Sequence, residues 1–396
     1  MSAINRLSYI ISSLFIVIAL LSCGGSSSAG DETPELAPYS YSPPDDIADG
    51  WNIADLNQLN IDPAPLESLI NKIQDGMTGY RLIDSVAIAQ NGQLIFSQRT
   101  RTELDLADNW ASNRNIELHV LNSVTKSVTS ALIGIAIDRG EISGVDVMVH
   151  DYFPEKQPIE NWTTDKANIT LENWLNMRSG YDWDEWNVNY LNSENLNAQM
   201  NNAADPIQFL LDRPMASEPG STFAYSTGIS YGIGRILQIA SGQTVADYLN
   251  EHLLQPLQIN AFDYWSLDGQ LHTGSALYLT TRDMLKFGQL FLDDGIWNGT
   301  RVISEEWVNQ STQQRVNFNN GGYGYQWWMS EFSVGDRAYS AFYGNGFGGQ
   351  FIFVFPVLEL VIALTGHAYE DAQGAEMNTR FVLENDILPS FVSGVL

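Results

Sequence analysis

The sequence predicts an α+β fold: one antiparallel sheet built from both chain ends and flanked by helices, with a mostly helical region inserted beside it. A hairpin pattern within residues 85–100 and strand-like runs after residue 338 supply the sheet. Helical segments and irregular loops dominate the residues between them. With 396 residues, of which 44% are hydrophobic, the chain can bury a large core.

The first predicted elements are a helix and a hairpin. In "DPAPLESLINKIQDG", Asp62 can cap a helix and Pro63 suits its first turn. Apolar residues recur on one face of that helix at Leu66, Leu69, Ile70 and Ile73. Two strand-like runs follow in "SVAIAQNGQLIFSQRT", and Asn91-Gly92 between them is a strong hairpin signal.

A helical subregion is predicted over about 150–330. Strands return in "YSAFYGN", "GQFIFVFP" and "LELVIALTG", and a last helix is predicted over about 374–387. We therefore expect the C-terminal strands to join the N-terminal hairpin in one sheet.

The N-terminus is typical of a secreted protein. Arg6 precedes the short apolar stretch 9–21, and small residues follow it, which predicts a signal peptide over 1–22. Cys23 stands where bacterial lipoproteins carry their lipidated cysteine, and this pattern resembles a lipoprotein box. The alternative is an ordinary signal peptide with an incidental cysteine.

We therefore expect secretion across the bacterial inner membrane and a lipid anchor on Cys23, facing the periplasm or in the outer membrane. A flexible tether rich in Gly, Ser, Pro and acids is predicted over 23–50, and the folded domain over 51–396. Cys23 is the only cysteine, so no intramolecular disulfide is expected.

The net charge of −28 excludes the basic surface that nucleic-acid binding requires. It also argues against docking on anionic lipid through basic patches. No obligate protein partner is indicated. An acidic, solubilising surface is the simplest interpretation.

The most informative motif is "SVTK", residues 123–126. Residues three apart share a helix face, so Ser123 and Lys126 can lie side by side. A serine hydroxyl needs a base to become a nucleophile, and a desolvated lysine has a lowered pKa. The alternative is a capping serine followed by a lysine that reaches solvent.

A second element is Tyr225 in "EPGSTFAYSTG", a polar loop before a helical segment. With "SVTKSVTSALIGIAIDRG" and "YGNGFGGQFIFVFP", this loop resembles the serine β-lactamase and penicillin-binding-protein superfamily, in its class C-like esterase and amide-hydrolase branch. The resemblance covers nearly all of residues 60–390. It implies a β-lactamase/transpeptidase-like fold and no cofactor or metal.

The resemblance also implies roles. Ser123 would be the acylated nucleophile, Lys126 its base, and Tyr225 the proton shuttle to the leaving group. The oxyanion hole would be the backbone N–H of Ser123 and one N–H from the closing strand, that of Phe347 or of the neighbouring Gly346. Lys126 is expected to lower the pKa of Tyr225.

The substrate pocket is expected to include Thr227, Asn345, Trp183 and Trp186. The aromatic run 181–190 would form a wall or lid, or else a surface loop packed on the helical region. Its acidic residues Asp182, Asp184 and Glu185 lack the spacing of a calcium loop.

Two departures from the family pattern bear on the substrate. Thr227 stands where β-lactamases commonly have Asn, and the closing strand lacks the lysine that holds a penicillin carboxylate. We therefore expect a small-molecule or peptide-like ester or linear amide as the substrate. A D-Ala-D-Ala-type carboxypeptidase or β-lactamase is the alternative activity, and a non-catalytic penicillin-recognising sensor or binding protein is the alternative class.

A competing motif is "GISYG", which fits the Gly-x-Ser-x-Gly elbow of α/β-hydrolases with Ser230 as nucleophile. Histidines follow it, but no apolar strand precedes it. His119, close to Ser123 in sequence, is expected to be a packed core residue rather than a catalyst.

Overall fold

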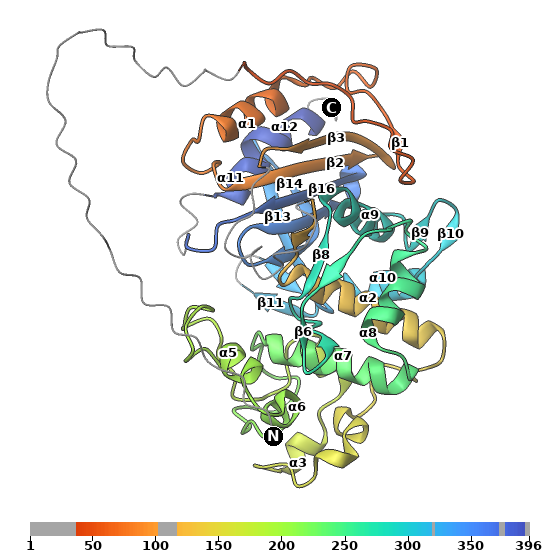
Figure 1. Ribbon diagram of the computed structural model, residues 1–396, viewed down its shortest axis with the longest axis vertical. Coiled ribbons are helices and arrows are strands. Elements are labelled where there is room, and N and C mark those ends of the chain that lie inside the picture. The colour runs from red at the N-terminus through yellow and green to blue at the C-terminus, as the bar shows by residue number, and fades with distance from the viewer. Residues whose placement is uncertain (1–36, 102–116, 319–320, 372–376, 393–396) are drawn as a thin grey trace, which may run out of the picture. The chain divides into compact units, whose positions relative to one another are not determined.

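The structure, a computed structural model, describes residues 37–101, 117–318, 321–371 and 377–392. The predicted signal peptide and Cys23 lie outside these residues. From Tyr39 onward the chain forms one compact unit. Its helices and strands are shown in Figure 1.

The core of this unit is a nine-stranded sheet with the order β1-β3-β2-β16-β15-β14-β13-β12-β11. Only β1 pairs in parallel, with β3, and the other pairings are antiparallel. The strands are β1 (Asn52–Ile53), β2 (Ile83–Gln90), β3 (Gln93–Arg99), β11 (Val316–Phe318), β12 (Gly321–Tyr323), β13 (Trp328–Val334), β14 (Arg337–Gly346), β15 (Gln350–Phe355) and β16 (Leu360–Gly366). The two chain ends meet where β2 pairs with β16, and the predicted sheet is confirmed.

The turn between β2 and β3 has the expected geometry. Asn91 and Gly92 have φ angles of 49° and 72°, both in the left-handed region. Asparagine and glycine adopt this region at low cost, and such a turn matches the twist of the strands it joins.

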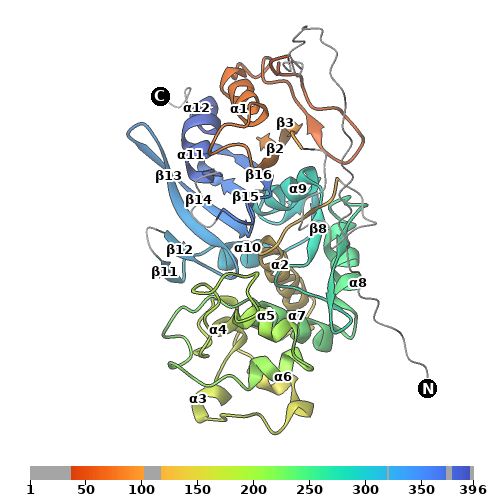
Figure 2. The ribbon, with the colours of Figure 1, turned by 60° about the vertical axis from the view of Figure 1, so that its left-hand side comes forward.

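Helices cover both faces of the sheet (Figure 2). On one face lie α1 (Ala64–Gln74), α11 (Thr379–Val382), η6 (Leu383–Ile387) and α12 (Pro389–Val392). Leu66, Leu69, Ile70 and Ile73 of α1 are buried there, as predicted. On the other face lie α2 (Val124–Asp138) and α9 (Thr281–Leu292).

The inserted region is smaller than predicted. Helix α9 packs on β15, β16 and β2, and the sheet resumes at β11, so neither belongs to a helical insertion over 150–330. The remaining helices are α3 (Thr164–Ala167), α4 (Leu171–Leu175), α5 (Leu196–Asn201), α6 (Pro206–Leu211), α7 (Thr227–Ser241), α8 (Val245–Leu249) and α10 (Glu305–Ser311).

Short strands form small sheets beside the large one. They are β4 (His119–Val120), β5 (Asp263–Tyr264), β6 (Ser266–Leu267), β7 (Gln270–Leu271), β8 (Leu277–Leu279), β9 (Ile296–Trp297) and β10 (Thr300–Arg301). The remaining short helical turns are η2 (Val149–Tyr152), η3 (Pro154–Lys156), η4 (Asn250–Leu254) and η5 (Pro356–Leu358). β4 pairs with β8, and this pairing holds the segment that leads into α2.

The tether predicted over 23–50 is wrong in its second half. The backbone N–H of Tyr39 donates to Asn71 Oδ1 at 2.6 Å, and that of Tyr41 donates to Glu67 Oε1 at 2.7 Å. Both rings contact Phe96, so aromatic packing and α1 fix this stretch to the folded unit. Among the described residues, no helix has the length and apolar character needed to span a bilayer.

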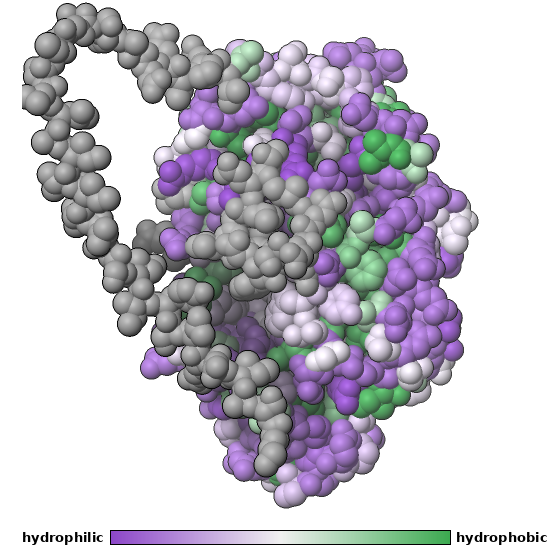
Figure 3. Space-filling view, in the orientation of Figure 1, coloured by the Kyte–Doolittle hydropathy of each residue, from purple (hydrophilic) through white to green (hydrophobic). Residues whose placement is uncertain are grey.

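The visible face of the molecule is mostly hydrophilic, with scattered apolar patches (Figure 3). This fits the high acidic content of the sequence.

Candidate active site

Ser123 immediately precedes the first turn of α2, and its hydroxyl does not cap the helix. A serine at this position ordinarily accepts a bond from a nearby backbone N–H. Here Lys126 Nζ lies 2.9 Å from Ser123 Oγ, one helical turn along the same face. The hydroxyl is therefore held by an amine and not by the backbone.

Lys126 is 1% exposed, so it does not reach solvent. Its amine also donates to Gly274 O at 2.8 Å and lies 3.0 Å from Thr227 Oγ1. Burial lowers the pKa of Lys126 to about 8, although the carboxylate of Glu185 opposes the shift. A lysine in this state can act as a base near neutral pH.

Tyr225 lies just before α7 and completes the cluster. Its ring centroid is 4.9 Å from Lys126 Nζ, and Trp186 and Trp328 stack on the ring at 5.2 and 5.7 Å. Burial and the Glu185 carboxylate raise the pKa of Tyr225, and a hydrogen bond with Ser123 opposes them. The expectation that Lys126 lowers this pKa is wrong, because burial and the Glu185 carboxylate both disfavour the phenolate. Tyr225 is a neutral phenol.

Glu185 is a carboxylate buried beside these groups, with 1% exposure. Its oxygens accept from Trp183 Nε1, Tyr190 OH, Thr227 N and Thr227 Oγ1 at 2.7–2.9 Å. In the sequence it appears only as one acid in an aromatic run. Its partner Thr227 is distant in sequence, so no local pattern could identify it.

The closing strand is β14, and its end lies against the segment that leads into Ser123. Asn122 Nδ2 donates to Phe347 O at 2.7 Å, and a Cβ on Gly346 would lie 2.2 Å from Leu121 O. A side chain at residue 346 would therefore force the end of β14 away from the segment that leads into Ser123. The choice between Phe347 and Gly346 as second oxyanion donor remains a prediction.

A cleft of about 400 Å³ opens at Ser123. Its lining consists of Asn122, Ser123, Tyr190, Leu191, Asn197, Ala198, Asn201, Asn202, Thr227, Trp265, Ser275 and Phe347. None of these described residues has a charged side chain. In the same described part of the chain, no three His, Cys, Asp or Glu side chains gather as a metal site would require.

The residues predicted for the pocket divide into two groups. Thr227 lines the cleft, and Trp186 is half-exposed where it stacks on Tyr225. Trp183 is buried against Phe209, and Asn345 lies on β14 outside the lining. The aromatic run 181–190 thus supplies Tyr190 to the cleft and Trp183 to the core.

The competing nucleophile Ser230 lies inside α7 and is fully buried, and its hydroxyl donates to Gln326 Oε1 at 2.7 Å. The sheet is almost wholly antiparallel, whereas an elbow serine follows a strand of a parallel sheet. The α/β-hydrolase interpretation is therefore wrong.

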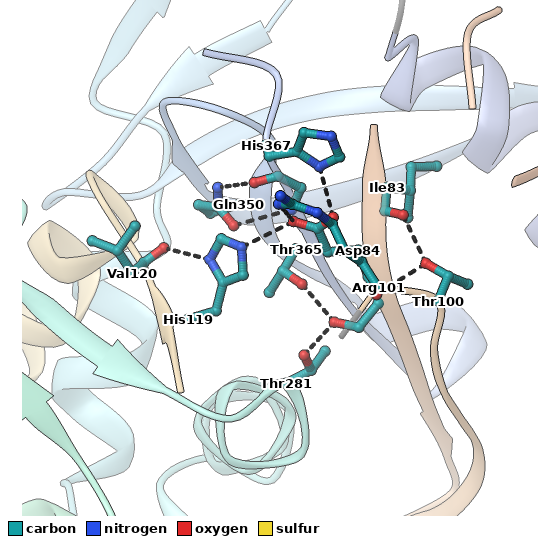
Figure 4. Close-up of polar contacts among 12 residues, drawn as sticks. Ile83, Asp84, Thr100, Arg101, His119, Val120, Thr281, Gln350, Thr365 and His367 are labelled. Atoms are coloured by element: carbon teal, nitrogen blue, oxygen red, sulfur yellow. Dashed lines mark hydrogen bonds and ion pairs between the residues drawn. The ribbon is translucent and has the colours of Figure 1, made fainter. Parts of the chain in front are cut away.

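His119 lies in a separate polar cluster around Asp84 of β2 (Figure 4). Its Nε2 bonds Asp84 Oδ2 at 3.1 Å, and His367 Nδ1 bonds Asp84 Oδ1 at 2.7 Å. Asp84 thus occupies one nitrogen of His119, and the carbonyl of Val120 lies 3.1 Å from the other.

A family model described as Beta-lactamase matches residues 69–386. The chain belongs to the beta-lactamase family. The resemblance drawn from its motifs is confirmed. The chain spans less than two thirds of the length of the first curated relative it matches.

The proteins to which this chain is similar carry different names. The 6-aminohexanoate-dimer hydrolase of Paenarthrobacter ureafaciens is 24% identical over 265 residues, or 62% of this chain and 64% of that relative. A family VIII carboxylesterase is similar with a TM-score of 0.59 at 15% identity, covering 77% of this chain and 91% of that one. An octameric penicillin-binding protein homologue from Pyrococcus abyssi has a TM-score of 0.59 at 16% identity, covering 84% and 80%. These structural likenesses show a shared fold.

Proposed function

We propose that this member of the beta-lactamase family is a serine hydrolase that cleaves a carboxylic ester or linear amide through an acyl-enzyme on Ser123. The observation that carries this proposal is the fully buried amine of Lys126, which lies 2.9 Å from Ser123 Oγ. An amine of lowered pKa beside a serine hydroxyl is the arrangement that activates a nucleophile.

The proposed reaction follows from these contacts. Lys126 takes the proton of Ser123, and the Ser123 oxygen attacks the substrate carbonyl. Backbone N–H groups of Ser123 and of Phe347 or Gly346 stabilise the oxyanion, where loss of one donor costs about 3–4 kcal/mol. The neutral phenol of Tyr225 donates a proton to the leaving group and recovers one from Lys126. Water then cleaves the ester on Ser123.

The cleft favours an uncharged acyl group. Its lining combines aromatic and aliphatic side chains with Asn and Ser groups and offers no cation among the described residues. A carboxylate entering it would lose hydration without gaining an ion pair. We therefore place esters and linear amides ahead of penicillin-type lactams and D-alanyl peptides, which carry carboxylates.

A substrate panel tests the proposed function. We expect turnover of short-chain p-nitrophenyl esters to exceed that of nitrocefin, and Ser123→Ala to abolish both. A fluorophosphonate probe should add its mass to the peptide that contains Ser123. A wild-type chain that no acyl or phosphonyl probe labels would instead be a binding or sensor protein.

We also propose that Cys23 carries a lipid anchor that tethers the exported enzyme to a membrane. The proposal is supported by the apolar stretch 9–21 and the small residues that follow it. In a bacterial host, Cys23→Ser should move the protein from the membrane to the soluble fraction or leave its leader uncleaved. Unchanged membrane fractionation with a normally cleaved leader would contradict this proposal.

A further inference from the structure

The hydroxyl of Thr227 lies between the base and a buried carboxylate. Thr227 Oγ1 is 2.7 Å from Glu185 Oε1 and 3.0 Å from Lys126 Nζ. A hydroxyl has a single proton and can either donate or accept toward each neighbour. Its direction must therefore be set by one of them.

Glu185 sets that direction. An ionised carboxylate only accepts, so the proton of Thr227 must point to Glu185. The oxygen of Thr227 is then left to accept from Lys126. Gly274 O, 2.8 Å from Lys126 Nζ, can also only accept.

These hydrogen bonds fix the orientation of the neutral amine. Uncharged Lys126 has two protons and one lone pair. Thr227 and Gly274 take the two protons, and the third neighbour is Ser123 Oγ at 2.9 Å. The lone pair therefore faces the proton that a base must remove from the nucleophile.

We propose that Glu185 is a positioning residue that, through the hydroxyl of Thr227, keeps the lone pair of Lys126 directed at Ser123. Glu185 lies outside the cleft lining and has no contact with the substrate space. This role rests on the proposed function, since it concerns the base of that same reaction.

The charge of Glu185 has a second, measurable consequence. The titratable groups that face Lys126 are Glu185, Tyr225 and His272. Burial, together with Lys126, lowers the pKa of His272 to about 3, and Tyr225 has a raised pKa, so both are neutral near neutral pH. Glu185 is the charged neighbour of Lys126 in this set, and it favours the ammonium form.

Glu185→Gln tests the proposal. The amide can donate to Thr227, which frees the Thr227 proton to point at Lys126 and turns the lone pair away from Ser123. We expect kcat for p-nitrophenyl butyrate to fall by about 10- to 100-fold, within the range of general-base effects, with little change in KM. The acid limb of the pH profile should move to lower pH, because the ammonium loses its stabilising charge.

A double-variant cycle separates this role from a structural one. Thr227→Val removes the intermediary, so Glu185→Gln should add little further loss of kcat in that background. Glu194→Gln, which neutralises an exposed carboxylate on the same segment, should match the wild type. Thermal unfolding of each variant reports whether the fold is intact.

Two results would overturn the role of Glu185 in different ways. An active wild type, with Glu185→Gln showing an unmoved acid limb or independent losses in the cycle, would reduce Glu185 to a structural residue. A wild type without labelling at Ser123 would overturn the proposed function, and this role with it.

Discussion

At the scale of the residue, the site depends on a lysine that water cannot reach. A buried ammonium loses its hydration, and its compensation here is a carbonyl, two hydroxyl oxygens and a carboxylate beyond one of them. The protonated form is therefore disfavoured without being excluded. The same burial keeps Tyr225 neutral, so in the proposed reaction Lys126 accepts a proton and Tyr225 donates one.

The pH dependence of acylation should follow Lys126. Because its pKa is lowered to about 8, kcat/KM for an uncharged ester should rise with pH below that value and level off above it. Stopped-flow acylation across the pH range measures this. A rate that is already maximal in mildly acidic solution would contradict Lys126 as the base.

Replacing Lys126 with an apolar residue should abolish activity and make the fold more stable. The folded-state pKa lies below the unfolded value of about 10.4, so the buried ammonium destabilises the native state below about pH 8. Lys126→Met should abolish turnover and raise the free energy of unfolding at neutral pH by on the order of 1–3 kcal/mol.

Urea denaturation of this variant and the wild type measures the difference. The gap should narrow as pH rises from about 8 to about 10.4, where the wild-type amine loses its proton in both states. A variant less stable than the wild type at neutral pH would show that the hydrogen bonds of Lys126 outweigh its desolvation.

At the scale of the element, the helix α2 and the end of β14 must approach closely to form the site. Glycines allow this approach and a second one, between α2 and α10. Gly346 faces Leu121 O, and Gly134 of α2 faces the ring of Trp307 on α10. One approach adjoins Ser123, whereas the other lies in the core of the helical side.

Gly346→Ala should damage both activity and stability. Its Cβ would lie 2.2 Å from Leu121 O, so β14 must shift away from the start of α2. We expect kcat/KM to fall by at least about tenfold and the free energy of unfolding by about 1–3 kcal/mol.

Gly134→Ala is the matched control for this change. Its Cβ would lie 2.3 Å from Trp307 Cδ1, so stability should fall while kcat/KM stays near the wild-type value. Full activity of Gly346→Ala would show that the closing strand tolerates displacement.

We expect side chains of helix α5 to accept hydrogen bonds from amide N–H groups of the substrate. Asn197 and Asn201 are one turn apart and line the cleft, and their Oδ1 atoms are buried acceptors without a donor among the described residues. Asn201→Leu should raise KM for a linear diamide about tenfold, because about one hydrogen bond to the substrate is lost. KM for a simple ester should not change.

Steady-state kinetics with a diamide and an ester of similar length measure this selectivity. Gln199→Leu, on the exposed side of the same helix, should leave both KM values unchanged. Equal effects on diamide and ester would show that Asn201 shapes the cleft without reading amide groups.

At the scale of the whole molecule, Asp84 joins segments from distant parts of the chain. It lies on β2 near the N-terminal end, His119 precedes helix α2, and His367 follows β16. Burial raises its pKa, but the hydrogen bonds of the two histidines outweigh this and hold the pKa of Asp84 below its ordinary value.

Asp84→Asn should therefore destabilise the fold in a pH-dependent way. A depressed folded-state pKa stabilises the native state above the unfolded pKa of about 3.9, and this contribution is lost as pH falls through the folded-state value. At about pH 6 we expect a loss of about 3 kcal/mol.

Denaturant unfolding of the variant and the wild type at about pH 6 and about pH 3 checks this. The difference between them should shrink at the lower pH. A difference that is equal at both values would mean that Asp84 acts through packing and not through its charge.

The hairpin, the buried stripe of α1 and the side-by-side placement of Ser123 and Lys126 were predictable, because each depends on residues within one turn or one strand pair. The limits of the helical insertion were not predictable. The sequence pattern of α9 shows a helix but does not show which surface that helix covers. Tyr39 and Tyr41 were assigned to the flexible tether because their partners on α1 and β3 are distant in sequence.

By itself, the sequence determined the family, the elements of the sheet and the placement of Lys126 beside Ser123, since periodicity and short motifs encode neighbours along one helix or hairpin. Only the tertiary structure decided which carboxylate accepts from Thr227, that Tyr225 is neutral, and that Trp183 is buried in the core. Burial and hydrogen-bond direction depend on segments that meet across the fold, and no local spacing records them.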